Sequence, residues 1–170
     1  IIEDFAKGKT NILCGTQLVS KGLDFDKVGL VGVVDADSML FYPDFRAYER
    51  CFDMLTQVAG RSGRGDKVGK VIIQTYNPLH QIFQEVANHN YRNMYNAQIV
   101  ERKLFRYPPF YHLVKINLQS KDINLLNEFA DTYAMKIRGI FGGRILGPEF
   151  PAVSKIRNLF IKTIILKLER

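Results

Sequence analysis

The segment that most constrains the fold is VGLVGVV, residues 28–34, an almost wholly apolar run that ends at Asp35. A continuous apolar run of this length is typical of a strand buried on both faces. VIIQTY, residues 71–76, has the same character. Apolar residues at helical spacing follow each run, so the first half is expected to alternate strands and helices in a parallel α/β sheet.

Local signals predict where these elements begin and end. Ile12–Gly15 is a short apolar run, interpreted as a further strand. Asp44, directly after Pro43, is expected to cap a helix. Asn77-Pro78 is expected to begin the next one. The first helix is expected to place Phe45, Tyr48, Phe52 and Leu55 on one face. It is expected to end at Gly60, Gly63 and Gly65.

The second half has the pattern of a small α+β domain. Pro108-Pro109 marks a boundary, because proline stops helix and sheet alike. Residues 114–118 alternate apolar and polar, as a half-buried strand does. Asp122 is expected to cap a helix that ends at Gly139, Gly142 and Gly143, and residues 160–168 form a strong strand. The expected domains are an α/β unit (1–88), a connecting helix (89–107) and a truncated α+β domain (108–170).

Charge differs between the two halves. Residues 1–87 carry 10 Lys and Arg against 11 Asp and Glu, a net charge of −1, whereas residues 88–170 carry 14 against 6, a net charge of +8. This asymmetry indicates a polyanionic partner for the second half or, equally, a solvated basic surface that keeps the protein soluble.

Several protein classes are excluded. No run of 18 apolar residues exists, so we expect no membrane-spanning helix. No signal-peptide pattern opens the chain. The two cysteines, Cys14 and Cys51, are too few for a disulfide framework or a zinc cluster. We expect both to be buried, reduced thiols, and reduced thiols are typical of the cytoplasm, where we expect the protein.

Two glycine-containing segments carry the chemistry. TQLVSKGLD runs from Thr16 to Asp24, and QVAGRSGR runs from Gln57 to Arg64. Arg61 and Arg64 are flanked by glycines that leave space around them. An arginine stays charged and presents a planar fork that matches phosphate oxygens, so this pair is a natural polyphosphate clamp.

These two segments resemble the fifth and sixth conserved motifs of superfamily 2 helicases, in order and in spacing. GTQLVSKGLDF, DADSMLFYPDFRAYER, TQVAGRSGR, IIQTYNPLH and RYPPF in succession resemble the primosomal replication-restart helicases, the PriA family (primosomal protein N′). The resemblance covers essentially the whole chain and is weakest between residues 123 and 144. It implies the end of a second RecA-like lobe followed by most of a C-terminal domain.

The resemblance implies a role for each motif residue. Contacts to the nucleic-acid backbone would come from Thr16, Gln17, Lys21 and Gly22. Asp24 would reach the nucleotide ribose or the metal-linked network, and Gln57 would bridge the lobes near the γ-phosphate. Arg61 and Arg64, with Gly60 and Gly63 beside them, would contact ATP phosphates held by the other lobe. Asp35 and Asp37 would lie at the cleft edge, with a helix or turn cap as the alternative for Asp37.

The resemblance also implies what this chain does not supply. No GxxxxGK[ST] loop and no acidic Walker B box occur in the 170 residues, so ATP and Mg²⁺ would be bound mainly by the other lobe. The chain by itself is therefore not expected to hydrolyse ATP. The family's zinc-binding insertion would lie upstream. The implied protein is an ATP-dependent 3′-5′ helicase that recognises stalled forks and restarts replication.

Basic and aromatic residues gather around Pro108-Pro109. This composition suits DNA, through phosphate pairing and base stacking, although aromatic core residues with solvated cations beside them fit it as well. The cluster contains Arg102, Lys103, Arg106, Tyr107, Phe110 and Tyr111. A second basic group comprises Lys155, Arg157, Lys162 and Lys167, of which Lys162 is expected to be partly buried or snorkelling. His80, His89 and His112 are interpreted as surface or capped histidines rather than as ligands.

The expected partners are forked or single-stranded DNA, single-strand-binding protein and primosome proteins, with the chain itself a monomer. Two alternatives remain open. The chain could be a non-catalytic DNA- or protein-binding module, or it could be the second lobe of another superfamily 2 enzyme, such as a branch-migration helicase.

Overall fold

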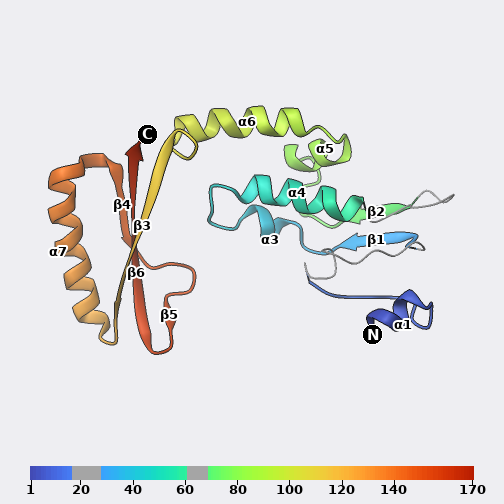
Figure 1. Ribbon diagram of the computed structural model, residues 1–170, viewed down its shortest axis with the longest axis horizontal. Helices are drawn as coiled ribbons and strands as arrows, with labels where there is room; N and C mark the ends of the chain where they lie inside the picture. The colour runs from blue at the N-terminus through green and yellow to red at the C-terminus, as the bar shows by residue number, and fades with distance from the viewer. Residues whose placement is uncertain (17–27, 61–68) are drawn as a thin grey trace. The chain divides into compact units, whose positions relative to one another are not determined.

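A computed structural model describes residues 1–16, 28–60 and 69–170 (Figure 1). The chain divides into two compact units, residues 1–98 and 99–170. The division falls inside helix α6 (Tyr91–Leu104). The domain bounds expected from the sequence, at residues 88 and 107, lie on either side of this helix and stay a prediction.

The first unit alternates helices with a parallel strand pair, and it confirms the expected α/β class. Its elements are α1 (Ile2–Ala6), β1 (Leu30–Val33), α3 (Asp37–Leu40), α4 (Ala47–Ala59), β2 (Lys70–Ile73) and α5 (Gln81–Ala87), followed by the start of α6. β1 and β2 pair in parallel, with Leu30 opposite Lys70 and Val33 opposite Ile73. Parallel pairing brings the carboxyl ends of both strands to one edge of the sheet.

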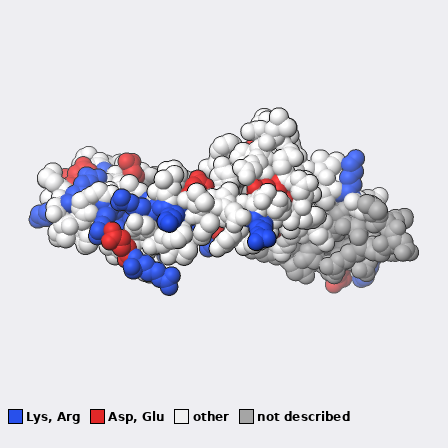
Figure 2. All heavy atoms as spheres, turned by 90° about the horizontal axis from the view of Figure 1, so that it is seen from above, with Lys and Arg blue, Asp and Glu red and all other residues white. Residues whose placement is uncertain are grey.

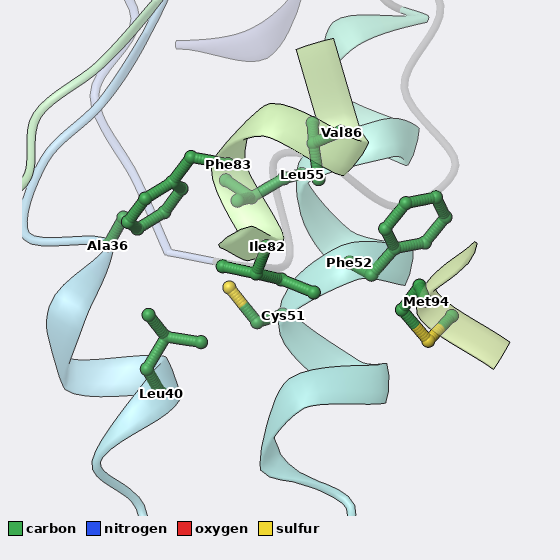
Figure 3. Packing of buried hydrophobic residues seen from close by; sticks show 9 residues of the cluster. All are labelled: Ala36, Leu40, Cys51, Phe52, Leu55, Ile82, Phe83, Val86 and Met94. Carbon is green, nitrogen blue, oxygen red and sulfur yellow. The ribbon is translucent and has the colours of Figure 1, made fainter. Parts of the chain in front are cut away.

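The core of the first unit lies between its helices. Figure 3 shows the buried side chains of α4 and α5 pointing toward one another, with a residue of α6 beside them. The helical spacing read from the sequence places these apolar residues on facing sides. The cluster consists of Ala36, Leu40, Cys51, Phe52, Leu55, Ile82, Phe83, Val86 and Met94.

Two helices begin later than predicted, α4 by two residues and α5 by three. The Asp44 side chain accepts a hydrogen bond from the Arg46 N–H at 2.9 Å, which closes a turn, and α4 begins only at Ala47. The helix after Asn77-Pro78 begins at Gln81, and its cap is His80, whose Nδ1 accepts from the Ile82 N–H at 3.2 Å. In both cases the polar residue makes a turn that precedes the helix.

Burial in the amino-terminal region differs from the prediction. Leu30 in β1 is 57% exposed and Ile72 in β2 is 49% exposed, because in the part of the chain that the structure describes these strands pair only with each other. Ile12–Gly15 forms no strand, and Cys14 is exposed. The expectation that both thiols are buried is confirmed for Cys51 and wrong for Cys14.

The second unit is an antiparallel sheet with one long helix, as the α+β pattern predicts. Its elements are β3 (Tyr111–Ser120), α7 (Ile123–Phe141), the 3₁₀ turn η1 (Gly142–Arg144), β4 (Ile145–Glu149), β5 (Lys155–Ile156) and β6 (Leu159–Glu169). The strand order is β3-β6-β4, and β5 forms a hairpin with β6. α7 runs beside these strands in Figure 1.

Helix α7 has the start that the sequence predicts, and it ends at the second of the three glycines expected to end it. Asp122 Oδ1 accepts from the N–H groups of Asn124 and Leu125, which confirms it as the cap. The helix runs through Gly139 and ends at Gly142, whose φ of 59° glycine adopts without strain. Its apolar face packs on the sheet, where the buried cluster is Ala134, Ile145, Ile164 and Leu166.

Candidate functional site

The packing of α4 fixes the direction of the residues that lead into the second motif. Cys51, Leu55 and Val58 are buried on one face of this helix. Gln57 lies on the other face and is less buried than these three. The helix ends at Gly60, whose N–H bonds to the Thr56 carbonyl at 3.0 Å. The core therefore anchors the turn from which QVAGRSGR continues.

Most residues of the two motifs lie outside the described part of the chain. Thr16, Gln57 and Gly60 are described. The residues on which no geometry can be given are Gln17, Lys21, Gly22, Asp24, Arg61, Gly63 and Arg64. Their roles stay predictions that rest on the sequence.

Asp37 ties the carboxyl ends of the two parallel strands together. Its carboxylate is buried, and it accepts one hydrogen bond from Thr75 Oγ1 at 2.8 Å and another from the Tyr76 N–H at 2.9 Å. Asp35, with φ of 56°, accepts from the Ser38 N–H at 3.3 Å. Both oxygens of Asp37 thus accept hydrogen bonds from the loop that follows β2. Asp37 does not cap its own helix, because the N-cap of α3 is Ala36.

His80 has a structural role in the first unit. Besides its cap hydrogen bond, its Nε2 lies 3.3 Å from the Tyr48 hydroxyl, and its ring packs at 5.9 Å from the Phe83 ring. These contacts link the start of α4 to the start of α5. His80 is therefore a helix cap itself, a role that the sequence analysis did not assign to it. His89 and His112 are exposed, as the surface interpretation predicts.

The cluster around Pro108-Pro109 gathers at the end of α6. Lys103 and Arg106 are exposed and Arg102 is half-buried. Phe105 is 53% exposed and Phe110 is 36% exposed. Cations beside accessible aromatic rings can pair with phosphates and stack on bases, which is the chemistry that single-stranded DNA requires.

Lys167, which the sequence analysis placed in the second basic group, contacts two residues of this cluster. Lys167 of β6 donates a hydrogen bond from Nζ to the Phe105 carbonyl at 2.6 Å, and the same Nζ lies 3.9 Å from the centre of the Tyr107 ring. Burial, with the nearby Arg106 charge, lowers the pKa of the Lys167 ammonium. Sequence spacing could not reveal this contact, which joins residues 62 positions apart.

The second basic group does not form one patch. Lys167 belongs to the cluster at the end of α6, as described above. Lys162 is buried, with Nζ 3.8 Å from Asp131 Oδ1 and 5.3 Å from the Phe150 ring centre. Lys155 and Arg157 lie in the hairpin of β5 and β6. The group is therefore divided among three environments.

The charge asymmetry follows the division into units. Residues 1–98 carry 11 Lys and Arg against 11 Asp and Glu, and residues 99–170 carry 13 against 6, so the whole net charge of +7 lies in the second unit. On the face drawn in Figure 2, blue spheres gather toward the left, over that unit. A surplus of this kind attracts a polyanion at moderate salt.

Membrane spans and metal clusters are both absent from residues 1–16, 28–60 and 69–170. In these ranges no helix is long and apolar enough to cross a membrane. Over the same ranges, no three His, Cys, Asp or Glu side chains are grouped so that they could hold a metal ion.

Comparison with known proteins places the chain among replication proteins. The family model described as the helicase conserved C-terminal domain matches residues 1–66. Replication restart protein PriA of Bacillus subtilis is 37% identical over 100% of this chain and 21% of its own length. The PriA of Synechocystis is 46% identical over 98% of the chain, and that of Thermotoga maritima is 34% identical over 99%. The chain spans about a fifth of the length of these relatives.

Proposed function

This chain belongs to the PriA family of replication restart proteins, and from that premise we propose that it acts within an ATP-dependent 3′-5′ DNA helicase that recognises stalled forks and restarts replication. The first unit supplies part of the second RecA-like lobe, and the second unit supplies a DNA-binding domain. The match of residues 1–66 to a helicase domain supports the helicase class.

In this proposal the chain contributes transition-state stabilisation to ATP hydrolysis. Arg61 and Arg64 contact the phosphates of an ATP whose Mg²⁺ and phosphate loop belong to the other lobe. As negative charge redistributes over the γ-phosphoryl oxygens, two guanidinium groups stabilise it. Gln57 lies near the γ-phosphate, and Asp24 contacts the ribose. The chain without the other lobe does not hydrolyse ATP.

One observation supports this assignment above the others. α4 is fixed by a buried face and ends at Gly60, one residue before Arg61. An arginine that stabilises a transferring phosphoryl group needs a rigid base, because a misplacement of about 1 Å can cost about 10²-fold in rate. A helix held by Cys51, Phe52 and Leu55 provides such a base.

The test is a chimera in which these 170 residues replace the matching segment of Bacillus subtilis PriA. We expect DNA-stimulated ATP turnover in the unmutated chimera, and a loss of about 10³-fold or more in Arg61→Ala or Arg64→Ala. Arg92→Ala is the matched control, because Arg92 is an exposed arginine of α6 outside both motifs. Normal turnover in the Arg61 and Arg64 variants would contradict the assigned roles.

A second candidate function is a binding module whose main activity is to hold DNA or a protein partner. The observation that favours it is the confinement of the net charge to residues 99–170. In this case the Arg61 and Arg64 variants keep both their ATP turnover and their DNA affinity, while variants of the second unit lose affinity alone. The two candidates are thus separated by measuring turnover and affinity on the same proteins.

The proposal extends to partners and location. Forked or single-stranded DNA is the nucleic-acid ligand, and single-strand-binding protein and primosome proteins are the protein partners. The protein works in the cytoplasm, where replication forks of bacterial cells lie. A pull-down of the chimera with purified single-strand-binding protein tests the first protein partner directly.

A further inference from the structure

The hairpin formed by β5 and β6 presents two cations at its end and has no assigned role. Ile156 pairs with Leu159, so the loop between the strands consists of two residues, Arg157 and Asn158. Their φ angles are 48° and 65°, as a type I′ turn requires. Residues 151–161 contain Lys155 and Arg157 and no carboxylate. The hairpin end is therefore basic, without acidic neighbours in its own segment.

The residue at the first loop position is unfavourable for the turn. A type I′ turn prefers asparagine, aspartate or glycine at both positions, because φ is positive. Asn158 satisfies this preference, whereas Arg157 gains nothing locally from it. Residues held in a sparsely populated backbone conformation cluster at functional positions. The arginine is thus present at the expense of turn stability, which points to a role for its side chain.

The other residues of the hairpin support a contact surface. Lys155 Nζ lies 4.6 Å from the centre of the Phe160 ring, a cation–π contact that restrains the amine. Ile156 is 50% exposed and Val153 is 61% exposed. A two-stranded ribbon with cations and apolar side chains at its end has dimensions that fit a groove of duplex DNA.

The distance from the hairpin to the cluster around Pro108-Pro109 indicates which nucleic acid fits. Leu159 and Lys167 stand eight residues apart on β6, and a strand rises about 3.4 Å per residue, so the two basic regions lie about 30 Å apart. The ladder between β3 and β6 is continuous over ten residue pairs, so this separation is fixed. A duplex is stiff on this length scale and holds its phosphates at fixed separations.

We propose that the β5–β6 hairpin, through Lys155 and Arg157, is a second contact to the phosphate backbone of duplex DNA, about 30 Å from the contact made at the end of α6. This inference rests on the proposed DNA-binding role of the second unit. It adds a separate site, and it assigns to the unit a duplex footprint of about one helical turn.

The test compares two double variants of the 170-residue chain that remove the same charge. Lys155→Gln with Arg157→Asn removes the two hairpin cations, and asparagine suits the positive φ. Lys115→Gln with Lys136→Gln removes two exposed cations from the middle of β3 and of α7. Fluorescence anisotropy measures the affinity for labelled duplexes of about 6, 12 and 20 base pairs, the shortest closed by a loop at one end, at several salt concentrations.

We expect the hairpin variant to bind the two longer duplexes more weakly, with a log–log salt slope shallower by about 1.8, since each phosphate contact contributes about 0.9. The shortest duplex, at about 20 Å, is too short to reach both sites, so there the variant matches the unchanged chain. The hairpin variant should unfold at the same temperature as the unchanged chain or at a higher one, which shows that its weaker binding is not caused by a loss of fold.

Other outcomes overturn the inference. Equal losses in the two double variants would mean that net charge alone matters. Undiminished binding by the hairpin variant, with weaker binding by a Lys103→Gln, Arg106→Asn variant, would remove the second site and leave the proposed function intact. If the hairpin variant bound only single-stranded DNA more weakly, the ligand of the hairpin would be a single strand and not a duplex. An unchanged chain that binds no DNA would remove the site together with the DNA-binding role.

Discussion

The strands β1 and β6 are both mainly apolar and differ in burial. Both are apolar and rich in β-branched residues, yet Leu30 of β1 is 57% exposed while Ile164 of β6 is fully buried. β6 lies between β3 and β4 with α7 against one face. β1 pairs only with β2 among the described residues. An apolar run therefore predicts a strand, and its neighbours decide how much of it is buried.

The two units also differ in where function-bearing residues lie. In the first unit the motif residues lie in two short segments, and the charges of residues 1–98 sum to zero. In the second unit the cations are spread over α6, the hairpin and the strands, and they leave a net charge of +7. Catalytic chemistry depends on a few placed side chains, whereas polyanion binding depends on many. We therefore expect substitutions in the two units to affect different measurements.

The largest effect is expected from removing a buried side chain of β6. Ile164→Ala leaves a cavity in the core of the second unit and should lower its free energy of unfolding by about 2–5 kcal/mol. Leu30→Ala, at an exposed position of β1, should cost about 0.5 kcal/mol or less. Urea unfolding followed by circular dichroism measures both. Equal losses would show that β1 is as buried in solution as β6.

A smaller effect is expected where side-chain hydrogen bonds tie strands together. Asp37→Ala leaves the Tyr76 N–H and the Thr75 hydroxyl without their acceptor and should cost the first unit about 1–3 kcal/mol. Asn117→Ala removes the acceptor of the Thr163 hydroxyl, and Asn117 is less buried than Asp37, so a smaller loss is expected. Denaturant midpoints of the two variants give the order, and the reverse order would contradict the buried role of Asp37.

The free energy of unfolding at alkaline pH tests how well the first unit's core buries Cys51. Burial, with the Asp37 charge adding to it, raises the pKa of the Cys51 thiol to about 12. The unfolded thiol, with a pKa of 9.0, ionises first, so the folded state holds the extra proton between pH 9 and about 12. Stability should therefore fall with rising pH in that window, by about 1.4 kcal/mol per pH unit at most.

Cys51→Ala removes this contribution, so the difference between the unchanged chain and the variant should shrink as pH rises above about 9. Cys14→Ala is the matched control, because Cys14 is exposed. Unfolding in urea at a series of pH values from about 8 to about 11 measures the difference. A constant difference across the series would show that Cys51 is accessible to solvent.

The sequence predicted the elements that carry strong periodic patterns. The apolar spacing of residues 126–137 and the cap at Asp122 placed α7, and the run 160–168 placed β6. It failed where a polar residue closes a turn before the helix, at Asp44 and at Asn77. It also predicted burial for β1, because burial depends on neighbouring strands that local patterns do not contain.

The candidate site was predicted in part. Sequence placed Arg102, Lys103 and Arg106 in one cluster, and the structure has them at the end of α6. It grouped Lys167 with Lys155 and Arg157, whereas Lys167 contacts the Phe105 carbonyl. Such a contact depends on the register of β3 and β6, which spacing along the chain does not give. The roles of Arg61 and Arg64 stay predictions.

The measurement that tests the central claim most directly is the salt dependence of DNA binding by the 170-residue chain. Anisotropy would be recorded with forked, single-stranded and duplex DNA for the unchanged chain and for Lys103→Gln with Arg106→Asn. Lys7→Gln with Arg92→Gln, from the first unit, is the control of equal charge.

We predict binding with a preference for forked DNA, and a duplex salt slope that becomes shallower by about 1.8 in the second-unit variant and stays unchanged in the control. An absence of binding at low salt, or equal slopes in both variants, would contradict the claim that the second unit binds DNA.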